Sequence, residues 1–201
     1  MSRIVFFLLL FACVSLHAQT TLDMKPTADL PFRQIPEAPA DYSAHAVTAR
    51  MIEGLGYRYY WATEKLRTED LAYKPSEDSR TAGETLDHLF GLSKTILNGF
   101  KQQPNVRPAP KQTLTFEQKR AQTLLNLHEA SELLRKQTAP MEDYKIAFKR
   151  GERSSEFPLW NMYNGPIADA IYHVGQIVAY RRASGNPMDS RVNVFMGKNR
   201  E

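Results

Sequence analysis

Cysteine is almost missing from this sequence: Cys13 is the single cysteine among 201 residues. It lies in an N-terminal segment with the features of a signal peptide, so an exported chain would carry no internal disulfide and no thiol nucleophile. Stability therefore has to come from packing. The length fits one domain, because domains usually span about 100 to 200 residues and a chain of this size can bury a real core.

The common signatures of nucleotide-binding proteins and serine hydrolases are also missing. The sequence contains no glycine-rich phosphate loop and no Gly-x-Ser-x-Gly elbow. A clustered basic face is missing too: the formal net charge is +4, and basic pairs such as Lys119-Arg120, Lys149-Arg150 and Arg181-Arg182 lie on separate segments. Nucleic-acid binding usually needs a concentrated positive surface, so we expect no nucleic-acid partner.

The N-terminus has the order of features that a signal peptide needs. A short basic start with Arg3 is followed by an apolar run over residues 4–14 and by Leu16-His17-Ala18. We expect residues 1–18 to be cleaved after Ala18, which gives a periplasmic or secreted protein of net charge +3 without a transmembrane segment. The alternative is a lipoprotein acylated at Cys13. Cleavage is favoured because Phe11 is bulky for the lipoprotein box and the apolar run before Cys13 is short.

Composition divides the remaining chain into three parts. Residues 19–40 are rich in Pro and Thr and lack periodicity, so we expect an extended N-terminal arm. Residues 41–187 carry the periodic segments of a helical bundle. Residues 188–201 form a C-terminal tail in which Val192, Val194 and Phe195 are candidates to dock on that bundle.

The first helix should begin near Asp41 or Ser43 and end near Leu66. Its expected inward stripe follows the helical period and consists of Val47, Met51, Leu55, Tyr59 and Ala62. Gly54 and Gly56 weaken the helix locally, since each costs about 1 kcal/mol relative to Ala. We expect them to permit close approach by a neighbouring helix.

Two capping boxes mark the starts of the next two helices. In Thr81-Ala-Gly-Glu84 and Thr115-Phe-Glu-Gln118, the first and last side chains satisfy each other's backbone amides. The two helices should run to about Gly99 and Thr138. His88 falls on the apolar side of the earlier one, beside Leu89, so it should point inward. A histidine there is either a hydrogen-bonded core residue or a metal ligand.

The chain before the last helix alternates apolar and polar residues from Tyr144 to Arg153 around Gly151, which predicts a small hairpin. The last helix should start at Pro166 and stop at Gly185 before Pro187. Four amphipathic segments thus predict an all-α four-helix bundle with a hairpin excursion. His45 and His128 are expected at the surface or at an edge.

The last helix carries two polar residues beside its apolar stripe. Asp169 and His173 are four residues apart, which stacks their side chains on one face of a helix, within reach of a common ion.

Two blocks of the sequence resemble the DinB-like superfamily. They are Tyr73-Lys-Pro-Ser with Thr81-Ala-Gly-Glu-Thr-Leu-Asp-His88-Leu-Phe, and Tyr172-His173-Val-Gly-Gln-Ile-Val-Ala-Tyr-Arg-Arg-Ala-Ser-Gly-Asn-Pro187. The resemblance covers about residues 41–187. It implies a four-helix bundle, often dimeric, that holds a divalent metal with three histidines. One of these comes from the second helix, and the other two lie four residues apart on a later helix.

Carried onto this sequence, the resemblance implies that His88 and His173 are metal ligands. Asp169 stands where the middle histidine would be. A carboxylate can bind zinc, nickel, manganese or iron, and its negative charge shifts the preference toward harder ions. The alternative is that Asp169 only hydrogen-bonds a neighbour and that metal binding has been lost.

These observations predict an exported, divalent-metal-dependent hydrolase or transferase that acts on a small molecule. Glu84, Tyr172 and Gln176 lie close enough in sequence to the expected ligands to assist, although each has a structural role as its default. The alternative is a non-catalytic bundle that binds a metal or a small ligand. A homodimer is expected from the resemblance.

Overall fold

The computed structural model describes residues 29–110 and 112–201. The chain forms four long helices: α1 (Ala44–Thr63), α3 (Ala82–Phe100), α4 (Phe116–Lys136) and α6 (Ala168–Ala183). Short helices α2 (Thr68–Ala72) and α5 (Trp160–Met162) lie between them, with a 3-10 turn at Met141–Asp143 and a π-helical turn at Tyr163–Ile167. The predicted signal peptide and the first part of the arm, residues 19–28, lie outside the described residues.

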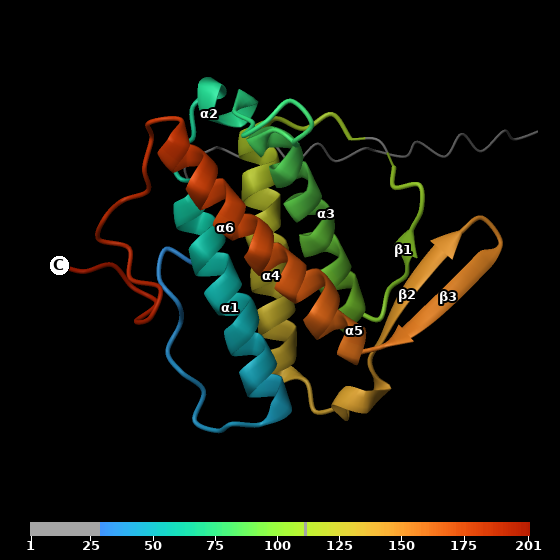
Figure 1. Ribbon diagram of the computed structural model, residues 1–201. Helices are drawn as coiled ribbons and strands as arrows, with labels where there is room; N and C mark the ends of the chain where they lie inside the picture. The colour runs from blue at the N-terminus through green and yellow to red at the C-terminus, as the bar shows by residue number, and fades with distance from the viewer. Residues whose placement is uncertain (1–28, 111) are drawn as a thin grey trace, which may run out of the picture.

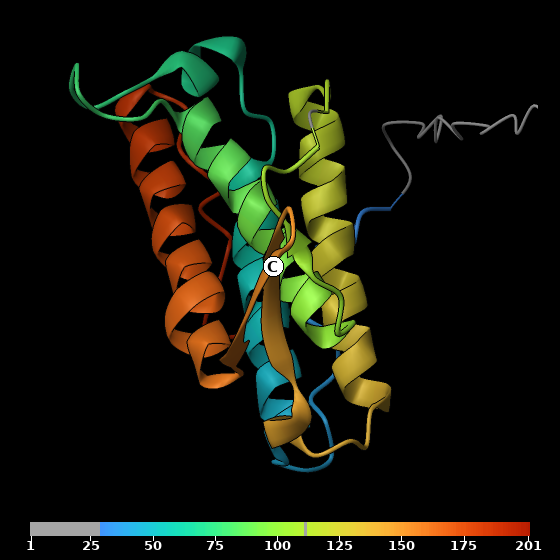
Figure 2. The ribbon, with the colours of Figure 1, turned by 90° about the vertical axis from the view of Figure 1, so that its right-hand side faces the viewer.

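The four long helices form a bundle in which each helix packs against two others. α1 and α3 both lie along α4, and α6 packs against α3 and α1. Both views show α1 and α6 running one way and α3 and α4 the other (Figures 1 and 2). The long connection between α3 and α4 returns the chain to the end at which α3 began. No helix in residues 29–110 and 112–201 is long and apolar enough to span a bilayer.

A small sheet accompanies the bundle, so the fold is mostly helical rather than purely α. The predicted hairpin is present as β2 (Lys145–Arg150) and β3 (Arg153–Pro158), antiparallel and joined at Gly151. β1 (Asn105–Val106) pairs parallel with β2. The hairpin projects from the helices (Figure 1).

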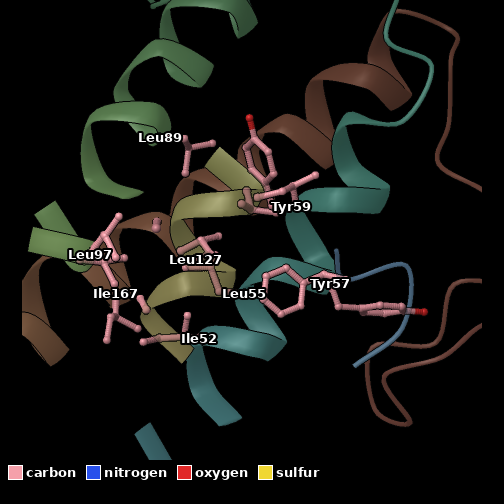
Figure 3. Close-up of a cluster of buried hydrophobic side chains, with 14 of the residues drawn as sticks. Ile52, Leu55, Tyr57, Tyr59, Leu89, Leu97, Leu127 and Ile167 are labelled. Atoms are coloured by element: carbon pink, nitrogen blue, oxygen red, sulfur yellow. The ribbon is translucent and has the colours of Figure 1, made fainter. Parts of the chain in front are cut away.

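The core lies between the four long helices. Side chains from α1, α3, α4 and the π-helical turn meet there, and those labelled in Figure 3 are Ile52, Leu55, Tyr57, Tyr59, Leu89, Leu97, Leu127 and Ile167. Both capping boxes form as predicted. The hydroxyls of Thr81 and Thr115 accept from the amides of Glu84 and Gln118, at 3.1 and 3.3 Å. These two helix starts therefore follow directly from local sequence.

α1 is covered on its outer side as well, which corrects its predicted stripe. Leu55 and other stripe members are buried, but Val47 and Met51 are 47% and 38% exposed. Instead, Tyr57 is fully buried and points toward the arm and tail (Figure 3). Its hydroxyl donates to Asn199 of the tail at 2.9 Å. Periodicity alone assumed a single buried face, whereas α1 has two.

The arm and the tail cover α1 together. Phe32 of the arm is buried over Gly56, where any Cβ would collide with its ring. Gly56 therefore leaves room for the N-terminal arm to pack on α1, and not for a neighbouring helix as expected. The amide of Ile35 donates to the carbonyl of Gly197 at 2.8 Å. In the tail, Val192 packs against the core as predicted. The prediction for Val194 and Phe195 was wrong, since these are 44% and 92% exposed.

The far end of α6 is locked to α2 by Asp70, whose side chain is almost fully buried. Its carboxylate accepts two hydrogen bonds from the Arg67 guanidinium, at 2.7 and 3.0 Å. It also accepts from Ser184 Oγ and Asn186 Nδ2, each at 2.6 Å. The Arg67 side chain, more than any other cause, holds the pKa of Asp70 well below its usual value.

Candidate metal centre

The structure brings together the three residues named from sequence. One potential ligand atom from each of His88, Asp169 and His173 lies within 4.8 Å of the others. Nε2 of His88 is 3.0 Å from Asp169 Oδ2, and Nε2 of His173 is 3.2 Å from Asp169 Oδ1. The two imidazole rings are nearly perpendicular, with centroids 4.7 Å apart. The carboxylate therefore lies between two rings whose Nε2 atoms both face it.

α3 supplies His88 from its second turn. The capping box fixes where this helix begins: Glu84 Oε2 accepts from the Thr81 amide at 2.8 Å and Thr81 Oγ1 accepts from the Glu84 amide. The Thr81 amide also lowers the pKa of Glu84. Glu84 is thus committed to the cap, not to assisting a reaction. Contrary to the prediction, His88 does not point into the core. Its side chain is 35% exposed and faces α6.

α6 supplies Asp169 and His173 from its first two turns. The helix does not start at Pro166 as predicted. Pro166 lies inside the π-helical turn, beside Gly165, whose φ and ψ of −100° and −108° are not helical. The regular helix begins at Ala168, so Asp169 sits in its first turn, where the helix dipole favours a negative charge. π-Helical turns often accompany functional sites. The Gly165-Pro166 pair is the sequence signal for this irregularity.

Gln176 orients the His173 ring. Its Oε1 lies 2.7 Å from His173 Nδ1. This contact leaves Nε2, the other ring nitrogen, facing the Asp169 carboxylate at 3.2 Å. A hydrogen bond on the remote ring nitrogen is the usual support of a metal-bound histidine.

The site opens to solvent on the face between α3 and α6. The side chain of Asp169 is 40% exposed, whereas that of His173 is only 13% exposed. Tyr172 is 65% exposed, and its ring centroid lies 5.3 Å from that of His173. Tyr172 therefore borders the cluster without contributing to it.

The other described histidines lie apart from this cluster. His128 sits at an edge, with its ring against Phe32. His45, expected at the surface or an edge, is half-buried beside Tyr144, with centroids 6.3 Å apart. Its Nε2 and the Tyr144 hydroxyl are both buried without a hydrogen-bond partner within the described ranges. Among the described residues, neither histidine belongs to a group of three potential metal ligands.

The fold is DinB-like. The crystal structure of a DinB-like protein, YjoA from Bacillus subtilis, matches 68% of this chain and 91% of its own length, with a TM-score of 0.52 and 17% sequence identity. No family model and no curated protein matches the sequence. The fold expected from the resemblance is thus confirmed. Together with a His/Asp group that could hold a metal ion, it is compatible with a metal-dependent function.

Proposed function

We propose that this protein is a divalent-metal-dependent hydrolase or transferase acting on a small molecule, with His88, Asp169 and His173 as metal ligands. One observation carries the proposal: the three side chains converge from two helices, with their ligand atoms within 4.8 Å of one another. Two imidazoles and one carboxylate suit zinc, nickel, manganese and iron(II).

The ligand set leaves coordination positions open, which is the property that separates catalytic from structural sites. A divalent ion bound there would polarise a substrate oxygen or lower the pKa of a bound water. The chain's own part is to hold the ligands. Gln176 fixes the orientation of the His173 ring, and the capped start of α3 fixes His88. Tyr172, exposed at the rim, is the side chain best placed to touch a substrate.

The first test is the metal content of protein purified without a metal-affinity tag. We expect about one equivalent of divalent metal per chain in the wild type and a large loss in His88→Ala, Asp169→Ala and His173→Ala. His128→Ala is the matched control, because it removes an imidazole elsewhere in the same bundle. Retained helicity by circular dichroism separates metal loss from unfolding. Wild-type protein without metal after incubation with zinc, nickel, manganese and iron(II) would refute the proposal.

A non-catalytic metal-binding bundle is the alternative function. The observation that favours it is the engagement of Glu84 in the helix cap, which leaves no second carboxylate from that turn to act as a base. Turnover of model esters, amides and phosphoesters by the metal-loaded protein, lost in Asp169→Ala, would favour the enzyme. Stoichiometric metal without any turnover across such a panel would favour the alternative.

Export and dimerisation belong to the same proposal. The order of features in residues 1–18 supports export, and it is tested by the N-terminal sequence of the mature protein, expected to begin at Gln19. The exposed Ile171 of α6 supports a homodimer. Light scattering should give twice the chain mass, and Ile171→Glu should reduce it to that of a monomer.

A further inference from the structure

A hollow lies on the projecting hairpin and shares no residue with the metal centre. Its volume is about 600 Å³, within the usual range for small-molecule sites. It is lined by four cationic side chains, two aromatic rings and two serines: Arg107, Lys149, Arg150, Arg153, Phe148, Phe157, Ser154 and Ser155. None of the lining residues is acidic.

The strand register explains how these residues meet. Arg150 lies directly opposite Arg153 at the tip, and Phe148 lies opposite Ser155. Opposed residues share a face of the sheet, and residues two apart return to it. Arg150, Arg153 and Phe148 therefore share one face, and Phe157 joins them, with its ring centroid 6.1 Å from that of Phe148.

Arg107 reaches the same face from the end of β1. Its amide donates to the Lys149 carbonyl at 2.7 Å, which continues the pairing of β1 with β2. Its guanidinium carbon lies 5.9 Å from the centre of the Phe148 ring. Arg107 thus joins Arg150 and Arg153 in lining the hollow beside Phe148.

The four cations that line the hollow have no ion-pair partner within the described ranges. By contrast, Lys119, Arg120 and Arg135 on α4 each pair with a carboxylate. The acid within β3, Glu156, lies opposite Ala147 and so belongs to the other face. Like charges directly opposite each other in a sheet are destabilising. A bound anion would relieve the repulsion between Arg150 and Arg153.

We propose that this hollow binds a small organic phosphate, with the phosphate at Arg107, Arg150 and Arg153 and an apolar ring or chain against Phe148 and Phe157. Guanidinium groups present paired N–H donors that match phosphate oxygens. Phe157 is 42% exposed, so it offers apolar surface to a ligand. A concave site of this size fits a compact molecule better than a flat bilayer or a long polyanion.

Calorimetry with phenyl phosphate, inorganic phosphate and phenol tests the proposal. We expect phenyl phosphate to bind more tightly than inorganic phosphate, and phenol not to bind. Arg150→Gln/Arg153→Gln should weaken phenyl phosphate binding at least tenfold. Arg182→Gln/Lys198→Gln, which removes the same charge elsewhere on the surface, should leave it within twofold. Phe157→Ala should reduce the preference for phenyl phosphate over inorganic phosphate.

Two outcomes would overturn the proposal. One is equal loss of binding in the hairpin variant and the control variant, which would indicate a general charge effect. The other is binding to phosphatidylglycerol vesicles, abolished in Arg150→Gln/Arg153→Gln, without binding of phenyl phosphate, which would assign the hairpin to a membrane surface. Asp169→Ala should retain phenyl phosphate binding, because the metal centre uses none of these residues.

Discussion

Nδ1 of His173 lies 2.7 Å from Oε1 of Gln176, one turn later on α6. This contact turns Nε2 of the same ring toward the Asp169 carboxylate. The packing of α3 against α6 sets the distance from His88 to the two ligands on α6. The orientation of the His173 ring, in contrast, is set within α6 alone. Gln176 is thus a positioning residue, which affects metal binding only by orienting the His173 ring.

Replacing Gln176 with Ala should weaken zinc or manganese binding by about 10- to 100-fold, the usual cost of losing the partner of a metal-bound histidine. The protein should remain folded, because Gln176 lies at the half-buried edge of the helix. Titration with a competing chelator measures the change. Gln122→Ala on α4 is the control and should bind metal as the wild type does. An unchanged affinity in Gln176→Ala would contradict the orienting role.

Replacing Asp169 with His would create the three-histidine set that the DinB-like resemblance implies. We expect this variant to keep metal binding and to shift its preference away from manganese toward zinc or nickel, because imidazole is a softer ligand than carboxylate. Competition between two metals, measured by elemental analysis, gives the ratio. An unchanged ratio would indicate that Asp169 does not contact the ion.

Asp70 should make stability depend on pH. Its folded pKa lies below its unfolded value, so the carboxylate contributes stability that is fully present above about pH 5 and is lost as the pH falls toward the folded pKa. Asp70→Asn should lower the free energy of unfolding by about 2 kcal/mol at neutral pH. It should also flatten the decline between about pH 5 and pH 3. Urea unfolding across this range measures both effects.

The control for Asp70 is Asp78→Asn, which removes the same charge from the exposed loop between α2 and α3. It should leave the neutral-pH stability close to that of the wild type. If Asp78→Asn and Asp70→Asn flattened the pH dependence equally, the effect would come from overall charge and not from the bonds of Asp70.

Gly56 and Gly175 should respond in opposite ways to substitution by Ala. A Cβ at Gly56 would overlap the Phe32 ring, so Gly56→Ala should destabilise the protein by about 1 to 3 kcal/mol. A Cβ at Gly175 meets nothing within 4 Å, so Gly175→Ala should stabilise it by about 0.5 to 1 kcal/mol through helix propensity. Thermal unfolding reports both. A neutral Gly56→Ala would mean that the arm does not pack on α1.

The local sequence correctly predicted features that depend on only a few neighbouring residues. The capping boxes at Thr81 and Thr115 start their helices as expected, because a cap needs only a residue and its third successor. The turn at Gly151 also forms, with φ of +58°. The start of α6 was mispredicted. Pro166 suits the first position of a helix, but here it lies inside the π-helical turn that comes before the regular helix.

The errors on α1 have a different cause. Val47 and Met51 follow the helical period, yet they face solvent, while Tyr57 is buried by the arm and tail. A period indicates that a face is apolar, but it does not indicate how many partners a helix has. The basic residues of the hairpin were likewise read as scattered, because Arg107 and Arg150 meet only when β1 pairs with β2.

The sequence by itself determined the approximate places of the four long helices, the hairpin turn and the pairing of Asp169 with His173, because each depends on residues within a few positions of one another. Tertiary structure alone decided that His88, 81 positions before Asp169, comes within 3.0 Å of its carboxylate. It also decided that Arg107, Arg150 and Arg153 line one hollow. Such contacts depend on how helices and strands pack, which is set by side-chain shape across the whole core and not by spacing along the chain.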